Sequence, residues 1–167
     1  PAVHLCRFEK IARALRAQTT RCKISIADLY KKTHKRLSTL EAEGIEVIDG
    51  DELPNDELRD LMIGMASIAK DNDITLQSCA EETNLDEFGI APGKCIDDEH
   101  LREALGLVVD SKKDPSQRKA CGCVVSRDIG MYDSCQFGCS YCYATVDFER
   151  SKTNFRSHDS ESPSLLG

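Results

Sequence analysis

Apolar residues recur at helical spacing in three long stretches of the chain. The spacing predicts amphipathic helices over residues 1–17, 29–40 and 54–70. The third has the clearest start, because Asn55 follows a proline and precedes two acidic residues that favour the positive end of a helix dipole. We expect the apolar stripes of these helices to pack on a sheet.

Two strands are predicted between the helices. Residues 21–27 alternate apolar and polar side chains, and residues 74–79 form a second strand, whereas residues 45–48 fit either a short strand or a loop. Because strands that alternate with long helices are typical of a parallel sheet, the predicted fold class is α/β, with βα units joined by right-handed crossovers. Two strands are too few for a closed sheet. We therefore expect a partial, barrel-like scaffold over residues 1–110.

The pattern changes in the second half of the chain, where glycine, proline and acidic residues interrupt it. A short helix is predicted between Asp97, as its capping residue, and Gly106, just past its end. Residues 111–160 are expected to form an irregular, cysteine-rich metal-cluster region that closes with a C-terminal helix over 141–156. Residues 161–167 are expected to be a frayed tail.

Composition and charge narrow the function. The chain has 167 residues, of which 40% are hydrophobic and 31% charged, and its net charge is -7. A negative chain does not supply the positive field that sequence-independent nucleic-acid binding needs, so nucleic acid is not indicated as a partner. No apolar run approaches the ~20 residues of a membrane span, and the N-terminus does not have the form of a signal peptide. We therefore expect no membrane partner.

The cysteine content is high, and the number of cysteines, nine, is odd. A complete disulfide framework would leave one thiol over, and disulfide-dense chains are usually small and loop-rich. The helical patterns of this chain should pack without covalent staples, so metal ligation is favoured over disulfides. Ligation by free thiols indicates a reducing compartment, and we expect a cytoplasmic protein.

The most specific motif is the C-x3-C-x2-C spacing of Cys135, Cys139 and Cys142. Such spacing lets one loop wrap a metal cluster, and Gly138 can adopt the positive φ that bends the loop. Three aromatic side chains could shield the site from water: Phe137, Tyr141 and Tyr143. Three ligands would leave one iron of a four-iron cluster open, whereas a fourth, distant thiol would close the site and make it structural. The spacing is compatible with both.

A second set of thiols consists of Cys79, Cys95, Cys121 and Cys123. Cys79 ends a predicted strand, where ligands gather in parallel sheets, and the last two lie in an irregular loop. Four thiols can ligate a second iron–sulfur cluster or a zinc ion, and the alternative is that some of them are small buried hydrophobes. The two remaining cysteines fall on core positions of a helix and a strand, where packing is expected: Cys6 and Cys22.

Weaker candidates lie next to these cysteines. Glu81 follows the strand that bears Cys79, and it fits either a base or hydrogen-bonding role at a cofactor or the start of a helix. Asp128 and Tyr132 precede the C-x3-C-x2-C motif and, together with Tyr141 inside it, could hydrogen-bond a bound cofactor. The four histidines have no paired spacing, and we expect them on the surface.

The C-x3-C-x2-C motif, with Tyr141 before its last cysteine, resembles the cluster motif of the radical S-adenosylmethionine enzymes. In that superfamily the three cysteines hold a [4Fe-4S] cluster whose free iron chelates S-adenosylmethionine, and the cofactor is then cleaved reductively. The resemblance implies both cofactors here, and an electron donor as a partner. This chain differs in two respects: its motif lies near the C-terminus instead of after the first barrel strand, and a Gly-Gly-Glu type segment is absent.

A wider resemblance is to an uncharacterised bacterial family of unknown function that carries this cluster near its C-terminus. The segments that carry the resemblance span nearly the whole chain: Ile24–Tyr30, Cys79–Glu82, Pro92–Asp97, Gln117–Cys123, Ser126–Ala144 and His158–Asp159. The resemblance implies that the chain is the C-terminal portion of a longer protein, and that the remainder of the N-terminal barrel is missing from this chain.

Together these features predict an iron–sulfur protein of the radical S-adenosylmethionine type, with an unknown substrate. An alternative from another class is a non-catalytic metal-binding module, either an electron carrier or a zinc-stapled domain. A third is a cytosolic thiol sensor, which would form reversible disulfides and bind no metal.

Overall fold

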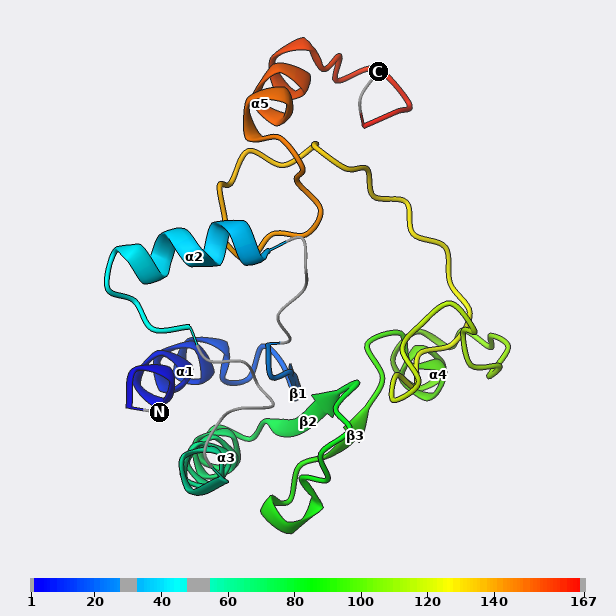
Figure 1. Ribbon diagram of the computed structural model, residues 1–167. Helices are drawn as coiled ribbons and strands as arrows, with labels where there is room; N and C mark the ends of the chain where they lie inside the picture. Colours follow the sequence, from blue (N-terminus) through cyan, green and yellow to red (C-terminus); the bar gives the residue numbers. More distant parts are fainter. Residues whose placement is uncertain (1, 28–32, 48–54, 166–167) are drawn as a thin grey trace. The chain divides into compact units, whose positions relative to one another are not determined.

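The computed structural model describes residues 2–27, 33–47 and 55–165 (Figure 1). Their helices and strands are, in order, α1 (Ala2–Leu15), β1 (Arg21–Ile24), α2 (His34–Ala42), α3 (Asn55–Asp71), β2 (Thr75–Cys79), the 3₁₀ helix η2 (Asp86–Phe88), β3 (Ala91–Gly93), α4 (Asp98–Leu105) and α5 (Phe148–Ser157). The chain divides into two compact units: unit 1 comprises Pro1–Ile26 and Glu52–Ser126, and unit 2 comprises Ala27–Asp51 and Arg127–Gly167. The predicted cysteine-rich region, 111–160, is shared between the two units.

The three strands of unit 1 form one parallel sheet in the order β1-β2-β3 (Figure 1). β1 and β2 correspond to the two predicted strands and are shorter than predicted. The sequence pattern misses β3, because Pro92 and Gly93 usually interrupt a strand; β3 is an edge strand, where the missing N–H of a proline is tolerated. The fold is therefore mixed α/β with a small open sheet. The described sheet is small and open, as expected for a partial scaffold, and it is not a closed barrel.

α1 and α3 pack against each other and against one face of the sheet (Figure 1). The buried core that they share with β2 and the turn around η2 is mainly aliphatic: Ala12, Met62, Ala69, Ile74, Leu76, Leu85 and Ile90. The two helices approach closely at Gly64, where a Cβ would lie 2.7 Å from a methyl carbon of Leu5. A larger residue at this position would require the Leu5 side chain to shift.

The second face of the sheet carries polar side chains and a cysteine. Side chains alternate across β2, so Leu76 and Ser78 are buried on the core side while Gln77 and Cys79 point the other way. Gln77 accepts a hydrogen bond from Lys23 of β1. Because Cys79 is the last residue of β2, the strand delivers it to the carboxyl edge, where parallel sheets commonly bind ligands.

α4 begins and ends where the sequence predicts. Asp97 caps it by accepting hydrogen bonds from the backbone N–H groups of Glu99 and His100, at 3.1 and 3.2 Å. Gly106 follows its last residue in a left-handed conformation. Both predicted caps are confirmed.

α5 is shorter than predicted. Asp147 accepts hydrogen bonds from the N–H groups of Glu149 and Arg150, at 2.9 and 3.1 Å, so the helix begins at Phe148. The prediction of helix over residues 141–147 is wrong, because this cap fixes the start of the helix after them.

Two predicted segments fall only partly on described residues. α2 begins at His34, and residues 28–32, which include the predicted start of this helix, lie outside the described residues. Residues 45–47 have no regular structure, while 48–54 again lie outside the described part.

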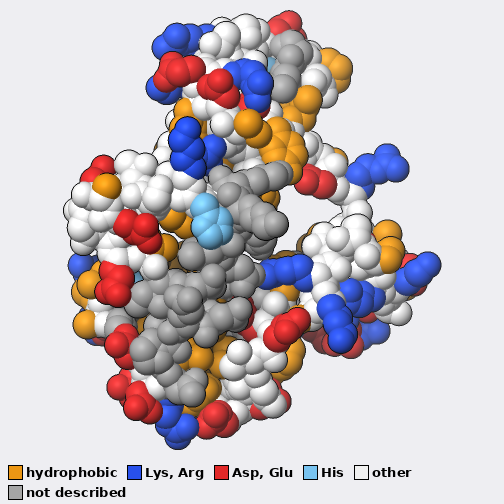
Figure 2. Space-filling model, in the orientation of Figure 1, with side chains coloured by type: hydrophobic (Ala, Val, Ile, Leu, Met, Phe, Trp, Pro, Cys, Tyr) orange, Lys and Arg blue, Asp and Glu red, His pale blue; other side chains and the backbone are white. Residues whose placement is uncertain are grey.

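Side chains of both charge signs are interspersed over the face of the molecule in Figure 2. Some large apolar side chains are also solvent-exposed, among them Val108. Among the helices of the described ranges, none combines the length and the apolar content that a membrane span needs.

Candidate functional site

Four cysteines of unit 1 lie together near the carboxyl ends of β2 and β3. We call Cys79, Cys95, Cys121 and Cys123 the unit 1 thiol group. Cys79 ends β2 and Cys95 closely follows β3, so the pairing of these strands brings their sulfur atoms to 3.0 Å from each other. Cys123 contacts the thiols of both Cys95 and Cys121. These pairwise contacts link all four sulfurs.

A loop that follows α4 carries the second half of this group. A hydrogen bond from the N–H of Asp114 to the carbonyl of Cys123, at 3.0 Å, joins two parts of its backbone. The loop contacts the segment after β3 twice: the N–H of Val124 donates to the carbonyl of Ile96 at 3.2 Å, and the N–H of Ile96 donates to the Cys123 sulfur at 3.3 Å. Hydrogen bonds to sulfur of this kind are typical around metal-bound thiolates.

The thiols of the unit 1 group ionise with different ease. Burial, followed by the hydrogen bond and the charge of Cys95, raises the pKa of Cys79 to about 12. Burial is also the main cause of the raised pKa of Cys121. For Cys123 burial acts in the same direction, but hydrogen bonds from the N–H of Ile96 and from neighbouring cysteines outweigh it and lower the pKa. Cys123 therefore ionises more readily than Cys79 and Cys121.

The other three predicted ligands lie in one loop of unit 2, residues 133–147, which we call the cysteine loop. Cys135 and Cys139 are exposed and Cys142 is half-buried. The N–H of Cys142 donates to the carbonyl of Cys139 at 3.0 Å, so a tight turn joins the last two cysteines of the motif.

Asp133 fastens the base of the cysteine loop. Its buried carboxylate accepts hydrogen bonds from the N–H groups of Val146 and Asp147, at 2.7 and 3.0 Å, and from Nε of Arg150 at 2.8 Å. Its own N–H donates to the carbonyl of Ala144 at 3.1 Å. The bond from Asp147 contributes most to holding the pKa of Asp133 below its ordinary value, and the guanidinium of Arg150 adds to it. The two ends of the loop are thereby joined through one ionised side chain.

α5 adds two further ties to the start of the loop. The buried hydroxyl of Ser151 donates to the carbonyl of Cys135. The amide nitrogen of Asn154 donates to the carbonyl of Asp133 at 3.0 Å. Together with Arg150, these side chains make α5 a platform for the loop.

Arg36 of α2 holds the C-terminal part of the loop. Its guanidinium donates to the carbonyls of Cys142 and Thr145, and to that of Val146 at 3.4 Å. The same guanidinium lies 4.6 Å from the centroid of the Phe148 ring, a cation–π distance. One cation therefore fixes the backbone around the last cysteine of the motif.

Thr145 is placed to stabilise the thiolate of Cys142. Its hydroxyl is buried and has no regular hydrogen-bond partner among the described residues. Contact with this hydroxyl is the main cause of the lowered pKa of Cys142, and the N–H groups of Ala144 and Thr145 and the charge of Arg36 add to it. Because a thiolate is a far better acceptor than a thiol, ionisation of Cys142 gives the Thr145 hydroxyl the partner that it lacks.

Neither set of thiols forms a completed coordination shell. No group of three or more His, Cys, Asp or Glu side chains in residues 2–27, 33–47 and 55–165 is arranged to hold a metal ion. Ligation at either place would need side chains to rotate toward one centre. The aromatic residues expected to shield the cysteine loop are open to solvent, with Phe137 77% and Tyr143 57% exposed.

Two of the predicted cofactor contacts make local hydrogen bonds. Glu81 accepts from the hydroxyl of Ser25 and the N–H of Ile26, both at 2.8 Å, and so ties the end of β1 to the turn after β2. Asp128 accepts from the N–H of Gly130 at 2.7 Å, within a turn of its own. Each carboxylate thus has a structural partner already.

The remaining predicted positions are mixed. Tyr132 and Tyr141 both belong to unit 2 and are exposed. Cys22 packs against the core of unit 1, as predicted. Cys6 is exposed on α1, so the prediction that it is a core residue is wrong: it lies outside the stripe of α1 that contacts α3 and the sheet.

Sequence reasoning missed the residues that fasten the cysteine loop. The capping signal at Asp147 could have placed the start of α5, and with it Arg150 on the first turn. Asp133 and Arg36 gave no local signal, since Arg36 lies 106 residues from Cys142 along the chain.

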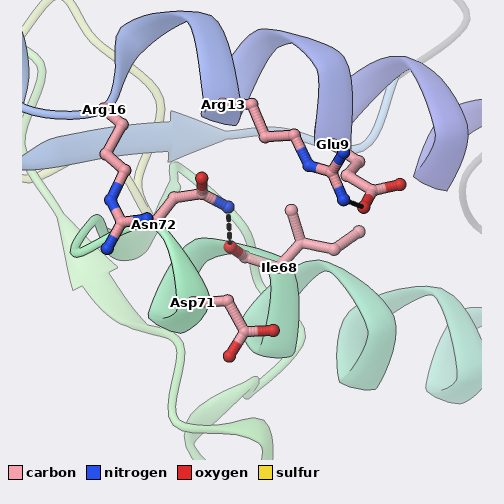
Figure 3. A pocket seen from close by; sticks show the side chains of 6 residues that line it. All are labelled: Glu9, Arg13, Arg16, Ile68, Asp71 and Asn72. Carbon is pink, nitrogen blue, oxygen red and sulfur yellow. Dashed lines mark hydrogen bonds and ion pairs between the residues drawn. The ribbon is translucent and has the colours of Figure 1, made fainter.

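An open pocket of about 410 Å³ lies between α1 and α3 of unit 1 (Figure 3). Its lining residues are Glu9, Arg13, Arg16, Ile68, Asp71 and Asn72. Arg13 pairs with Glu9 at 2.5 Å, and Arg16 pairs with Asp73 at 3.3 Å. Its lining includes neither a cysteine nor any predicted site residue, so it is separate from the thiol sites.

The fold and the two sets of thiols define a cysteine-rich α/β protein. The chain belongs to the family described as domain of unknown function DUF1848, whose model matches residues 1–144. This confirms the resemblance to an uncharacterised family of unknown function. The matched range includes all nine cysteines and ends before α5. No curated protein and no solved structure matches the chain significantly.

Proposed function

We propose that the cysteine loop of unit 2 binds a [4Fe-4S] cluster through Cys135, Cys139 and Cys142. The observation that carries the proposal is the fastening of this three-thiol loop, by Asp133 and α5 at its base and by Arg36 along its C-terminal part. A backbone held in this way can present ligands with little loss of freedom on binding. Two of the thiols stay open to solvent, where a cluster can be inserted.

The donor chemistry of the loop fits such a cluster. Thiolate ligands select iron–sulfur clusters and zinc among the common protein metals. The hydroxyl of Thr145 and the N–H groups of Ala144 and Thr145 favour the ionised form of Cys142, which is the form that binds iron. Hydrogen bonds to cluster sulfurs also set the reduction potential. The loop therefore offers both ligands and a means of tuning them.

Three ligands leave one corner of a four-iron cluster free, and that iron would chelate the amino and carboxylate groups of S-adenosylmethionine. The residues of unit 2 nearest the motif in sequence that could hydrogen-bond the cofactor are Asp128, Tyr132 and Tyr141. The function supported best is thus a radical S-adenosylmethionine-type enzyme that acts on an unknown substrate and takes an electron from a separate donor.

The test is the iron and sulfide content of the full chain isolated without oxygen. Wild type should hold about four irons and four sulfides, and Cys139→Ala should lose them. Cys6→Ala, which removes an exposed thiol on α1, is the matched control and should retain the cluster. Iron that remains bound in Cys139→Ala would exclude the loop as the site.

The enzymatic part of the proposal needs its own measurement. The cluster-loaded protein, chemically reduced, should bind S-adenosylmethionine with a change in its electron paramagnetic resonance spectrum and should then cleave it. A cluster that forms but neither responds to the cofactor nor cleaves it would leave a non-catalytic iron–sulfur protein.

A non-catalytic metal-binding module is the second candidate function. The unit 1 thiol group favours it, because four thiols linked by pairwise contacts could close a coordination shell and leave no position for a substrate. Zinc in the isolated protein, with neither iron nor sulfide, would favour this alternative.

A further inference from the structure

The unit 1 thiol group has no part in the function proposed for the cysteine loop, although the fold gathers it from three separate segments. Its members come from the end of β2, from the residues after β3 and from the loop after α4. Cys121 and Cys123 are each only 7% exposed. Cysteines that served only as small core residues would have no need to face one another.

We propose that the unit 1 thiol group binds a single zinc-type ion through Cys79, Cys95, Cys121 and Cys123. Two thiolates on one zinc ion, each about 2.3 Å from the metal, lie about 3.8 Å apart. The sulfurs of Cys79 and Cys95 are already 3.0 Å apart, so this pair is within the reach of one ion, and the side chains of the group would rotate toward it. A four-iron cluster bonds each sulfur to a different iron and would hold the sulfurs farther from one another.

The surroundings of the group resemble those of a metal-bound thiolate set. The N–H of Ile96 points at the Cys123 sulfur at 3.3 Å, the kind of outer contact that orients a ligand. Gly122, between two of the ligands, lets the stem of Lys94 pass close by: a Cβ there would lie 3.2 Å from Cγ of Lys94. Lys94 is itself held by Asp98, at 2.7 Å. The turn between the ligands is thus covered by an ordered side chain.

The loop that carries Cys121 and Cys123 has little apolar packing to stabilise it, and a bound ion would supply that stability. Residues 107–126 contain no helix and only an isolated bridge between Lys113 and Val124. Their buried side chains are few, and Val124 is the only aliphatic one among them: Asp114, Cys121, Cys123 and Val124. Segments that lack an apolar core are commonly held by a metal or a disulfide. Here the ion would staple this loop to the edge of the sheet.

The first experiment measures zinc and iron together in the full chain. Wild type should contain one zinc ion in addition to any iron, and Cys123→Ser should lose the zinc. Cys6→Ser should keep it. Cys139→Ala should keep zinc while it loses iron, so that failure of this proposal is distinguishable from failure of the cysteine-loop proposal. Iron and sulfide that are lost with Cys123→Ser, in place of zinc, would overturn the single-ion proposal.

A second measurement does not depend on the folding of a variant. Wild-type protein is treated with a thiol-alkylating reagent, with and without a strong zinc chelator, and the modified cysteines are mapped by mass spectrometry. The chelator should expose the four thiols of the group and leave the labelling of Cys6 unchanged. Equal labelling of Cys95 with and without chelator would overturn the proposal. So would a Cys79–Cys95 disulfide in protein isolated under reducing conditions.

Replacement of zinc by cobalt reports the geometry and the ligand type of the site through absorption spectroscopy. Cobalt bound by four thiolates in a tetrahedron has intense visible and sulfur-to-metal absorption bands. We expect both sets of bands in wild type and in Cys139→Ala, and their loss in Cys123→Ser. Weak bands of octahedral cobalt in wild type would contradict a tetrathiolate site.

Discussion

The two thiol sites are built in opposite ways. The unit 1 thiol group collects its sulfurs from the ends of two paired strands and from a loop, and two of its members are buried. The cysteine loop carries its three sulfurs within one short segment and exposes two of them. The first site depends on the tertiary fold of unit 1, whereas the second depends on the hydrogen bonds of Asp133 and Arg36 to a single loop.

This contrast separates a structural site from a reactive one. A closed set of buried thiols suits an ion that remains in place and contributes to folding, whereas an exposed and locally fastened loop suits a cluster with a position open to another molecule. Changes to the aliphatic core should therefore affect the first site more than the second, and changes to the loop fastening should do the reverse.

The largest effect is expected from truncation of the unit 1 core. Met62 is 3% exposed and packs in the core between α3 and the sheet. Met62→Ala should lower the free energy of unfolding by about 2–5 kcal/mol, because it removes buried contacts and leaves a cavity. Urea unfolding measures the loss. Mapped alkylation should show faster labelling of Cys121 and Cys123.

The matched control is the neighbouring residue on the same helix. Ile63 is 48% exposed, so Ile63→Ala should cost on the order of 1 kcal/mol or less. In Met62→Ala the labelling of Cys135 and Cys139 should stay as in wild type. Equal acceleration at all these thiols would break the comparison, since the cysteine loop would then depend on the same core.

The second prediction concerns the base of the cysteine loop. Asp133→Ala removes the acceptor for the N–H groups of Val146 and Asp147 and for the guanidinium of Arg150. Loss of a partner outside the ligand set typically weakens metal binding roughly 10–100-fold, and we expect a loss of that size in the affinity for iron. Competition with an iron chelator measures it.

Asp159→Ala is the control for this variant, because the Asp159 carboxylate accepts a local hydrogen bond, from the N–H of Glu161 at 3.0 Å. It should bind iron as wild type does. Zinc in unit 1 should be unchanged in both variants. Hydrogen exchange of the metal-free protein should also show faster exchange at Val146 in Asp133→Ala alone; unchanged exchange there would mean that Asp133 does not fasten the loop.

The features of the fold and of the thiol sites that the sequence predicts are those formed by residues close together in the chain. The C-x3-C-x2-C motif, the capping of α4 by Asp97 and the strand that ends at Cys79 are local features, and the sequence pattern reveals each of them. The edge strand β3 was not predicted, because its proline and glycine are residues that usually interrupt a strand, although it pairs with β2. The hydrogen bonds of Arg36 were not predicted, because nothing in the sequence of α2 indicates a partner more than one hundred residues away.

The third prediction concerns strain next to the unit 1 thiol group. Ala80, directly after Cys79, has a φ of 55°, in the left-handed region that costs a residue with a Cβ roughly 1–2 kcal/mol. Ala80→Gly should therefore raise the free energy of unfolding by about 1 kcal/mol after the extra freedom of glycine in the unfolded chain is subtracted. Urea unfolding tests this.

Ala66→Gly, inside α3, is the control of opposite sign and should lower the stability by about 1 kcal/mol. If Ala80→Gly also retains its zinc, the strain at residue 80 is not needed to place the cysteine ligands. A loss of stability in Ala80→Gly would show that the left-handed turn is not strained.

The smallest effect is expected in the loop that carries Cys121 and Cys123, and only in acid. The Ser116 hydroxyl donates to the buried carboxylate of Asp114 at 2.6 Å, and this bond is the main cause of the lowered pKa of Asp114. A carboxylate whose pKa is lower when folded adds stability that is fully present above its unfolded pKa of about 3.9, and that is lost as the pH falls through the folded pKa.

Ser116→Ala should move the pKa of Asp114 up toward its ordinary value, so the stability of unit 1 should fall less steeply below about pH 4 than in wild type. Carbon chemical shifts of the Asp114 carboxyl report its titration directly, and Ser111→Ala, at an exposed serine in the same segment, is the control. If the Asp114 titration is the same in Ser116→Ala as in wild type, the hydroxyl does not set its pKa. If acid exposes Cys121 to alkylation equally in both, the loop is held by its sulfurs and not by Asp114, which would sharpen the contrast with the cysteine loop.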